Sequence, residues 1–245
     1  MERLFDICYR KSMKQFLLTV LLTFGLFALC AQDFYWGAYL YPNYSDRRLI
    51  AIGANLSEQM IQEIEDRETG KFSLSGGGQL GWRGERAGFQ LGLGFAETGY
   101  RTVREPVPPD SPDAGEASQQ QFVYRNYNLE LPLEIHFVHE LDYQNFFYFM
   151  LGGVGSYNLT NRTVKILYDG DLSERSDAPP PEEAYRRTNF AFQAGLGWER
   201  SLGGTTHFYL QPNFQFWLSG LLREAPINRS LYNLGVVVGL KFYRE

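Results

Sequence analysis

The chain alternates apolar and polar residues with a period of two through most of its length, and this pattern restricts the fold more than any other feature. A period of two is typical of β-strands, whose successive side chains point to opposite faces. In eight segments one of the two residue sets is apolar throughout and contains no charge. The predicted strands span residues 34–44, 72–83, 88–101, 122–138, 146–160, 187–199, 206–219 and 230–243.

The other residue set of each segment is polar or small, as in Gln211, Asn213 and Gln215. Alternation alone does not orient the sheet, because a soluble barrel with an apolar core would show it too. The positions of the aromatic residues orient the sheet better. If both termini are periplasmic, each segment has an aromatic residue of its apolar set at the periplasmic end. We expect these rings to form a girdle at a lipid interface: Trp36, Trp82, Phe89, Phe137, Phe147, Trp198, Phe208 and Phe242.

Most segments carry a second ring near the other end, namely Phe72, Phe95, Tyr127, Tyr157, Phe190, Phe216 and Tyr232. Two aromatic belts about nine to eleven residues apart match the two interfaces of an outer-membrane barrel. In the core of a soluble barrel, aromatic residues are not expected to gather at two levels along the strands. We therefore predict an all-β fold, a closed antiparallel eight-stranded transmembrane β-barrel with up-and-down topology, in a bacterial outer membrane.

The lengths of the connections support this topology without any use of hydrophobicity. Long or proline-rich connections at 45–71, 102–121, 164–186 and 220–229 alternate with short ones at 84–87, 139–145 and 200–205. Outer-membrane barrels have long outer loops and short periplasmic turns. The short connections are therefore predicted to lie in the periplasm.

Residues 1–31 are typical of an export signal, with Lys14 before an apolar run and Ala31 at its end. The run is too short for an ordinary membrane-spanning helix. Met13 is a possible start of translation, and lipidation of Cys30 is the competing interpretation of the segment. Residues 32–245 then form the barrel.

Both cysteines, Cys8 and Cys30, lie in this leader, so the remaining chain cannot use disulfides or thiol chemistry. The leader contains four basic and two acidic residues, and its removal changes the net charge from −5 to −7. Such a surface repels polyanions, so nucleic-acid binding is disfavoured. No cofactor or metal site is predicted, because the 169–174 stretch lacks the glycine and distal glutamate of a calcium loop.

The interior of an eight-stranded barrel is only wide enough for packed side chains, so a diffusion pore is not expected. Charged residues of the inward set must then be paired and hydrogen-bonded. We predict that four of them form a structural polar network inside the barrel: Glu130, Glu134, Lys241 and Arg83.

Two features leave alternatives open. His136, His139 and His207 allow the hypothesis of a lipid-modifying enzyme, although no serine is placed convincingly beside them. Asn55 or Ser57 can cap a short amphipathic helix that ends near Gly70. This helix is either a small lid in the first outer loop or a partner-binding element.

Several strands resemble those of a known family, the Bacteroidota outer-membrane β-barrel domain, which includes OmpX-like barrels and the secretion-associated PorT-like proteins. The resemblance is carried by residues 128–135, 147–157, 194–199 and 234–242. The chain departs from such barrels at its end, where Arg244 and Glu245 follow the last aromatic residue. The resemblance implies a membrane barrel, and it permits a role as an accessory of a secretion or assembly machine.

The expected function is that of a non-enzymatic outer-membrane protein whose surface loops serve adhesion, ligand contact or envelope integrity. The secretion accessory and the lipid-modifying enzyme remain the alternatives. The expected partners are outer-membrane lipids and lipopolysaccharide, together with periplasmic chaperones and the barrel-assembly machinery during insertion.

Overall fold

The computed structural model describes residues 33–51, 57–179, 184–223, 225 and 227–244. The predicted export segment and Asn55 lie outside these residues. No helix among them is both long and apolar enough to cross a membrane. The elements are β1 (Asp33–Ala51), α2 (Glu58–Arg67), β2 (Glu68–Thr69), β3 (Lys71–Arg83), β4 (Ala87–Thr102), β5 (Glu105–Pro106), β6 (Gln119–Glu140), β7 (Asn145–Asp169), β8 (Leu172–Ala178), β9 (Thr188–Gly203), β10 (Thr206–Trp217) and β11 (Ile227–Tyr243).

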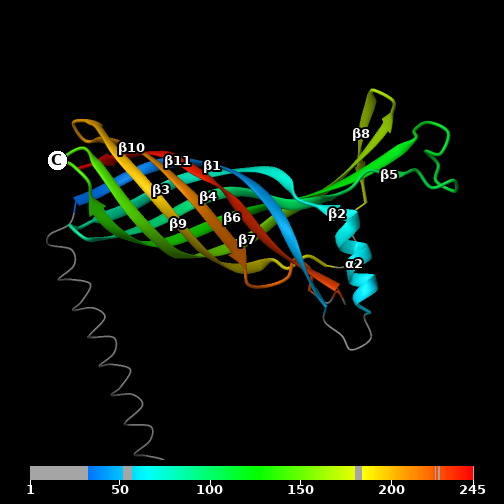
Figure 1. Ribbon diagram of the computed structural model, residues 1–245, viewed down its shortest axis with the longest axis horizontal. Coiled ribbons are helices and arrows are strands. Elements are labelled where there is room, and N and C mark those ends of the chain that lie inside the picture. Colours follow the sequence, from blue (N-terminus) through cyan, green and yellow to red (C-terminus); the bar gives the residue numbers. More distant parts are fainter. Residues whose placement is uncertain (1–32, 52–56, 180–183, 224, 226, 245) are drawn as a thin grey trace, which may run out of the picture.

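Eight of the strands close into one antiparallel ring (Figure 1), in the order β4-β3-β1-β11-β10-β9-β7-β6 and back to β4. Strands that follow one another in the ring are neighbours in sequence, and β1 pairs with β11 to close the barrel. The predicted eight-stranded up-and-down barrel is therefore confirmed. Closure matters because it leaves no unpaired sheet edge within the ring.

The apolar residue set faces outward and the polar set faces the barrel axis. Leu131 and Leu196 are 50% and 49% exposed, whereas Glu134 and Asn213 are 6% and 4% exposed. A soluble barrel would show the opposite arrangement, because its apolar residues would fill the interior. The outer surface is suited to contact with hydrocarbon.

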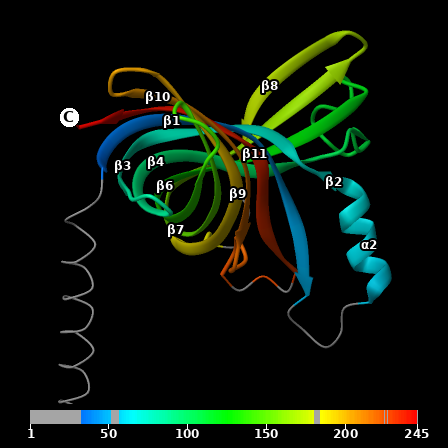
Figure 2. The same cartoon turned by 60° about the vertical axis from the view of Figure 1, so that its left-hand side comes forward.

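The two ends of the barrel differ strongly (Figures 1 and 2). One end, called the turn end here, carries the short connections at 84–86, 141–144 and 204–205 and lies near the C-terminus. The other, the loop end, carries α2 and a protruding sheet made by β5, β8 and the ends of β6 and β7. The alternation of short and long connections expected from the sequence is present.

Several strands are longer than the sequence pattern predicted. β1 continues past Tyr44 to Ala51 along β11, and β7 continues past Thr160 to Asp169 and turns back into β8. The predicted long loop 164–186 is therefore partly a hairpin. Beyond the apolar band both faces of a strand can meet water, so the hydrophobic alternation ends while the backbone pairing continues.

Helix α2 begins after Ser57, whose side chain accepts a hydrogen bond from the backbone N–H of Met60. This confirms Ser57 as the cap, but the helix ends at Arg67 rather than near Gly70. Glu68 and Thr69 pair with β4, which ends the helix three residues earlier.

Three interior tyrosines each lie over a glycine of the neighbouring strand, directly opposite in the register. The pairs are Tyr35 with Gly81, Tyr148 with Gly197, and Tyr209 with Gly239. In each pair a Cβ atom on the glycine would overlap the tyrosine ring. The inward glycines thus make room for large rings in a narrow barrel.

Candidate functional site

The turn end of the interior is organised around one carboxylate, that of Glu199 on β9. Lys241 Nζ and Arg83 Nη1 each donate a hydrogen bond to it at 2.7 Å. His207 Nδ1 lies 2.7 Å from Glu199 Oε1, and the Tyr243 hydroxyl donates to the same oxygen at 2.8 Å. Glu199 is 2% exposed, so the two cations supply the counter-charge that a buried carboxylate requires.

Lys241 lies in a cage of the three tyrosines that pack on glycines. Its Nζ is 4.8, 5.0 and 4.8 Å from the ring centroids of Tyr35, Tyr148 and Tyr209. The hydroxyls of these rings donate at 2.9 Å to Gln90, Gln211 and Gln79, respectively. Cage and carboxylate therefore occupy the interior of the barrel together, and all five side chains are almost fully buried.

Glu134 lies nearer the loop end and is linked to the cage through Gln90. Its carboxylate accepts hydrogen bonds from Gln90 at 3.1 Å and Gln193 at 3.0 Å. His136 Nε2 lies 2.8 Å from Glu134 Oε2, and the His136 ring stacks on Tyr148 at 4.6 Å. Amides and an imidazole therefore surround Glu134, without a lysine or arginine.

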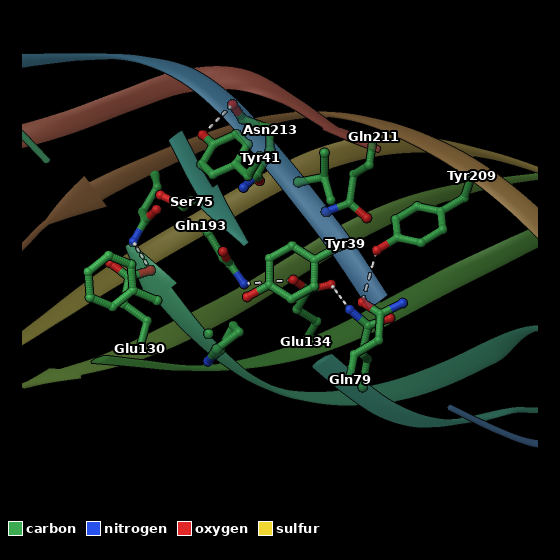
Figure 3. Close-up of a pocket in the computed structure, with 16 residues that line it drawn as sticks. Tyr39, Tyr41, Ser75, Gln79, Glu130, Glu134, Gln193, Tyr209, Gln211 and Asn213 are labelled. Carbon is green, nitrogen blue, oxygen red and sulfur yellow. Dashed lines mark hydrogen bonds between the residues drawn. The ribbon is translucent and has the colours of Figure 1, made fainter. Parts of the chain in front are cut away.

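A cavity lies between Glu134 and the next carboxylate along β6, Glu130 (Figure 3). Among the side chains that the structure describes, Glu130 accepts one hydrogen bond, from Gln215 Nε2 at 3.5 Å. Glu130 Oε1, Asn213 Oδ1 and Gln79 Nε2 are buried without a partner in the described part of the chain. The cavity is small and lined by polar groups, so it suits a few waters rather than an organic ligand.

The four residues predicted to form an interior polar network lie at three levels of the barrel. Arg83 and Lys241 meet at Glu199, Glu134 binds amides and His136, and Glu130 borders the cavity. None of the described ion pairs joins either cation to Glu130 or Glu134, and the link between the first two levels runs through Gln90, which bonds both Tyr35 and Glu134. A structural role for the four residues as one network stays a prediction. Glu199 was missed, although it continues the inward set of Gln193, Gly195 and Gly197.

The predicted girdle residues lie around the turn end. Trp36 stacks on Phe242 at 4.5 Å, and Trp82 and Trp198 contact Phe89 and Phe208 at 6.2 and 6.5 Å. Phe147 is the register partner of Trp198. Phe137, the remaining member, is 51% exposed. Contact of this ring of side chains with a lipid interface stays a prediction.

At the loop end, Glu68 ties α2 to the barrel. Arg229 of β11 donates two hydrogen bonds to it, at 2.6 Å from Nη2 and 3.0 Å from Nε, and Arg47 Nε of β1 donates at 3.1 Å. Arg47 Nη2 also donates to the backbone carbonyls of Glu65 and Glu68. We call this set the Glu68 clamp. It holds the C-terminal end of α2 against two strands, an arrangement that favours the lid over a free partner-binding helix.

The sheet that protrudes from the loop end comprises residues 103–123 and 164–178 and is called the β5–β8 extension. Lys165 of β7 forms an ion pair with Asp113 in the connection between β5 and β6. Arg104 lies over the Tyr168 ring at 3.9 Å. These contacts fold the connection back onto the sheet. β8 pairs only with β7 among the described strands, so its other edge is open.

A family model described as the outer membrane protein beta-barrel domain matches residues 30–220. This chain belongs to that family. The barrel is thus located in the bacterial outer membrane. We expect its loop end to face outward, because such barrels place their short turns in the periplasm.

Solved structures with a similar fold include Neisserial surface protein A, at 11% identity and a TM-score of 0.42, covering 86% of this chain and 97% of that one. The outer-membrane protease OmpT from Escherichia coli has 9% identity and a TM-score of 0.45, with the same coverages of 86% and 97%. The attachment invasion locus protein Ail of Yersinia pestis has 8% identity and a TM-score of 0.32, covering 83% and 98%. No curated protein matches the outer-membrane barrel.

Two histidine–carboxylate pairs bear on the enzyme hypothesis, His136 with Glu134 and His207 with Glu199. Both histidines are buried inside the outer-membrane barrel, and His139 is exposed at the turn end. No group of three or more histidine, cysteine or acidic residues in the described ranges could hold a metal ion. The stretch from Asp169 to Glu174, considered above as a calcium loop, forms the turn and the start of β8.

The Glu68 clamp gives a first prediction. In the Glu68→Gln variant, trypsin is expected to cut after Arg67 at least about tenfold faster than in the wild type, because charge-assisted hydrogen bonds worth about 1.5–3 kcal/mol each are weakened. Limited proteolysis of the folded barrel measures this rate. Glu63→Gln changes an exposed carboxylate of the same helix and should leave the rate unchanged. Equal rates for the two variants would contradict a tethering role.

Proposed function

We propose that this barrel is a non-enzymatic surface protein that binds a macromolecular partner outside the cell through its β5–β8 extension. The observation that carries the proposal is the contrast between a packed interior and a protruding sheet. Lys241, its three tyrosines and Glu199 occupy the interior near the turn end, an arrangement that argues against a channel for solutes. The part of the protein that is available to a partner is therefore the β5–β8 extension, which lies beyond the end of the barrel.

The extension has features of a binding platform. Its sheet is ordered by the Lys165–Asp113 ion pair and by backbone pairing between β6, β7 and β8. All side chains of β8 from Leu172 to Asp177 are exposed, and Leu172 is 75% exposed. An open strand edge can accept an extended segment of another protein by adding a strand to the sheet. Adhesion or ligand contact is supported on this basis.

The test shortens the extension while keeping the barrel. Lys165 and Ser176 are register partners, so residues 166–175 can be replaced by an Asn-Gly turn that joins them as a two-residue hairpin. Cells displaying this variant are expected to lose attachment to the extracellular proteins or sister cells that wild-type cells bind. Folding is checked by the difference in gel mobility between heated and unheated samples.

The matched control changes a turn at the other end. Gly204 has a φ of +57°, a left-handed conformation that asparagine tolerates, so Gly204→Asn changes only a periplasmic turn. This variant should attach like the wild type. Unchanged attachment of the shortened variant would refute the proposal. A secretion or envelope-permeability defect in a deletion strain, together with unchanged attachment, would favour the secretion-accessory or envelope-integrity role instead.

A further inference from the structure

Basic residues gather on the outward face of β4, β6 and β7, directly beyond the outer aromatic belt. The belt is marked there by Phe95 and Tyr127, whose rings stack at 5.8 Å, and by Tyr157, which is 45% exposed. One step further along the outward face, Arg125 of β6 is the register partner of Arg162 of β7. Arg101 of β4 follows two residues beyond the level of Arg125 and is exposed.

The arginines are only partly compensated by carboxylates. Arg125 Nε lies 3.7 Å from Glu97 Oε1, and Lys71 Nζ lies 2.7 Å from the same oxygen. Arg162 pairs with Asp177, and this hydrogen bond lowers the pKa of Asp177, which keeps the carboxylate ionised. Arg101 forms no ion pair with a described residue, and Arg125 Nε is buried without a hydrogen-bond partner.

The patch is therefore defined as Arg101, Arg125 and Arg162 with the two carboxylates of Glu97 and Asp177. Lys71 is only 5% exposed and balances Glu97 from the inner side, so two positive charges of the arginines remain in surplus. The chain as a whole has a net charge of −5. A local excess of positive charge on an acidic protein needs an explanation from its surroundings. At this height the outward face meets the headgroup layer of the outer leaflet, because the belt marks the boundary of the hydrocarbon.

We propose that this patch binds the phosphate groups of lipid A, the glycolipid anchor of lipopolysaccharide in the outer leaflet. Guanidinium groups bind phosphate oxygens by paired, charge-assisted hydrogen bonds. Arg101 offers a guanidinium without an ion pair to a described residue, and the Arg125 side chain is 37% exposed beside it. The rings of Phe95 and Tyr127 below them offer a surface for the acyl chains and sugar. The patch lies on the side of the barrel and meets the β5–β8 extension at Asp177, the partner of Arg162.

The test compares bound lipids by native mass spectrometry of the barrel purified from outer membranes and exchanged into detergent. Diphosphorylated lipid A is expected to bind the wild type, and the double variant R101Q/R125Q should bind it about tenfold or more weakly, since each basic residue near an anionic lipid surface contributes about fivefold. Dephosphorylated lipid A should bind both proteins equally weakly. Higher salt should weaken the binding of diphosphorylated lipid A to the wild type.

Two controls and a second variant complete the design. R175Q changes an exposed arginine of β8 and R86Q one at the turn end, and both should bind lipid A like the wild type. R101Q alone removes a side chain without an ion pair, so it tests the site even if the double variant folds poorly. Wild-type affinity in R101Q and in the double variant would overturn the proposal. Equal binding of phosphatidylglycerol, or of dephosphorylated lipid A, would overturn it as well.

Discussion

Replacing Glu199 with alanine is expected to lower the free energy of unfolding by about 3–5 kcal/mol, the usual cost of removing one partner from a buried ion pair. The substitution leaves Lys241, which is 2% exposed, and Arg83 without their shared counter-charge. It also removes the acceptor of the Tyr243 hydroxyl. Urea unfolding of the barrel in lipid vesicles, followed by tryptophan fluorescence, measures the change.

Two further variants separate lost charge pairing from lost packing. Glu140→Ala removes an exposed carboxylate at the end of β6 and should change stability by less than about 0.5 kcal/mol. Combining Glu199→Ala with Lys241→Met should recover part of the lost unfolding free energy, because the double variant no longer contains a buried lysine without its counter-charge. A loss below about 1 kcal/mol for Glu199→Ala would show that Glu199 does not organise the turn end.

The second large effect is expected from a single methyl group. Gly197→Ala places a Cβ where the ring of Tyr148 lies, and Tyr148 is 1% exposed with His136 stacked on it at 4.6 Å. The ring cannot move without disturbing His136 and Lys241. We expect a loss of about 3 kcal/mol, at the upper end of what overpacking a core costs, measured by the same unfolding experiment.

Gly153→Ala is the matched control on a neighbouring strand. Gly153 faces outward, and the nearest atom to an added Cβ is the Ala191 carbonyl oxygen at 3.8 Å, an ordinary contact. This variant should keep its stability within about 0.5 kcal/mol, since surface substitutions usually do. Equal losses for the two variants would mean that the effect belongs to glycine in strands generally, rather than to the tyrosine–glycine pair.

Much of the fold could be predicted from the sequence because a membrane requires one face of every strand to be apolar. Leu131 and Leu133 belong to the apolar residue set, which could be assigned to the outer face from the positions of the aromatic rings. Both leucines are exposed as expected. The ends of β1 and β7 could not be predicted in this way. Residues such as Arg47 and Lys165 lie beyond the apolar band, where strand pairing is not reflected in hydrophobicity.

The interior contacts were harder to predict, because they depend on the register between strands distant in sequence. The alternation along each strand places Glu199 and Lys241 in the inward set. The registers of β9 with β10 and of β10 with β11 then bring the two residues to the same height along the barrel axis. The Glu68 clamp joins residues 161 positions apart, and no local pattern around Glu68 indicates its partners. The lipid-A patch likewise depends on the alignment of Arg125 with Arg162 across β6 and β7.

The position of Lys241 in the final strand has a consequence for biogenesis. The three tyrosines and Glu199 come from β1, β7, β9 and β10, so all of them precede the cation that they surround. A nascent chain that stops before β11 would lack the seam with β1 and would leave Glu199 with Arg83 as its one cationic partner of the two. Closure of the barrel and full charge pairing of its lumen therefore come with the same strand, which gives assembly factors a physical difference between finished and truncated chains.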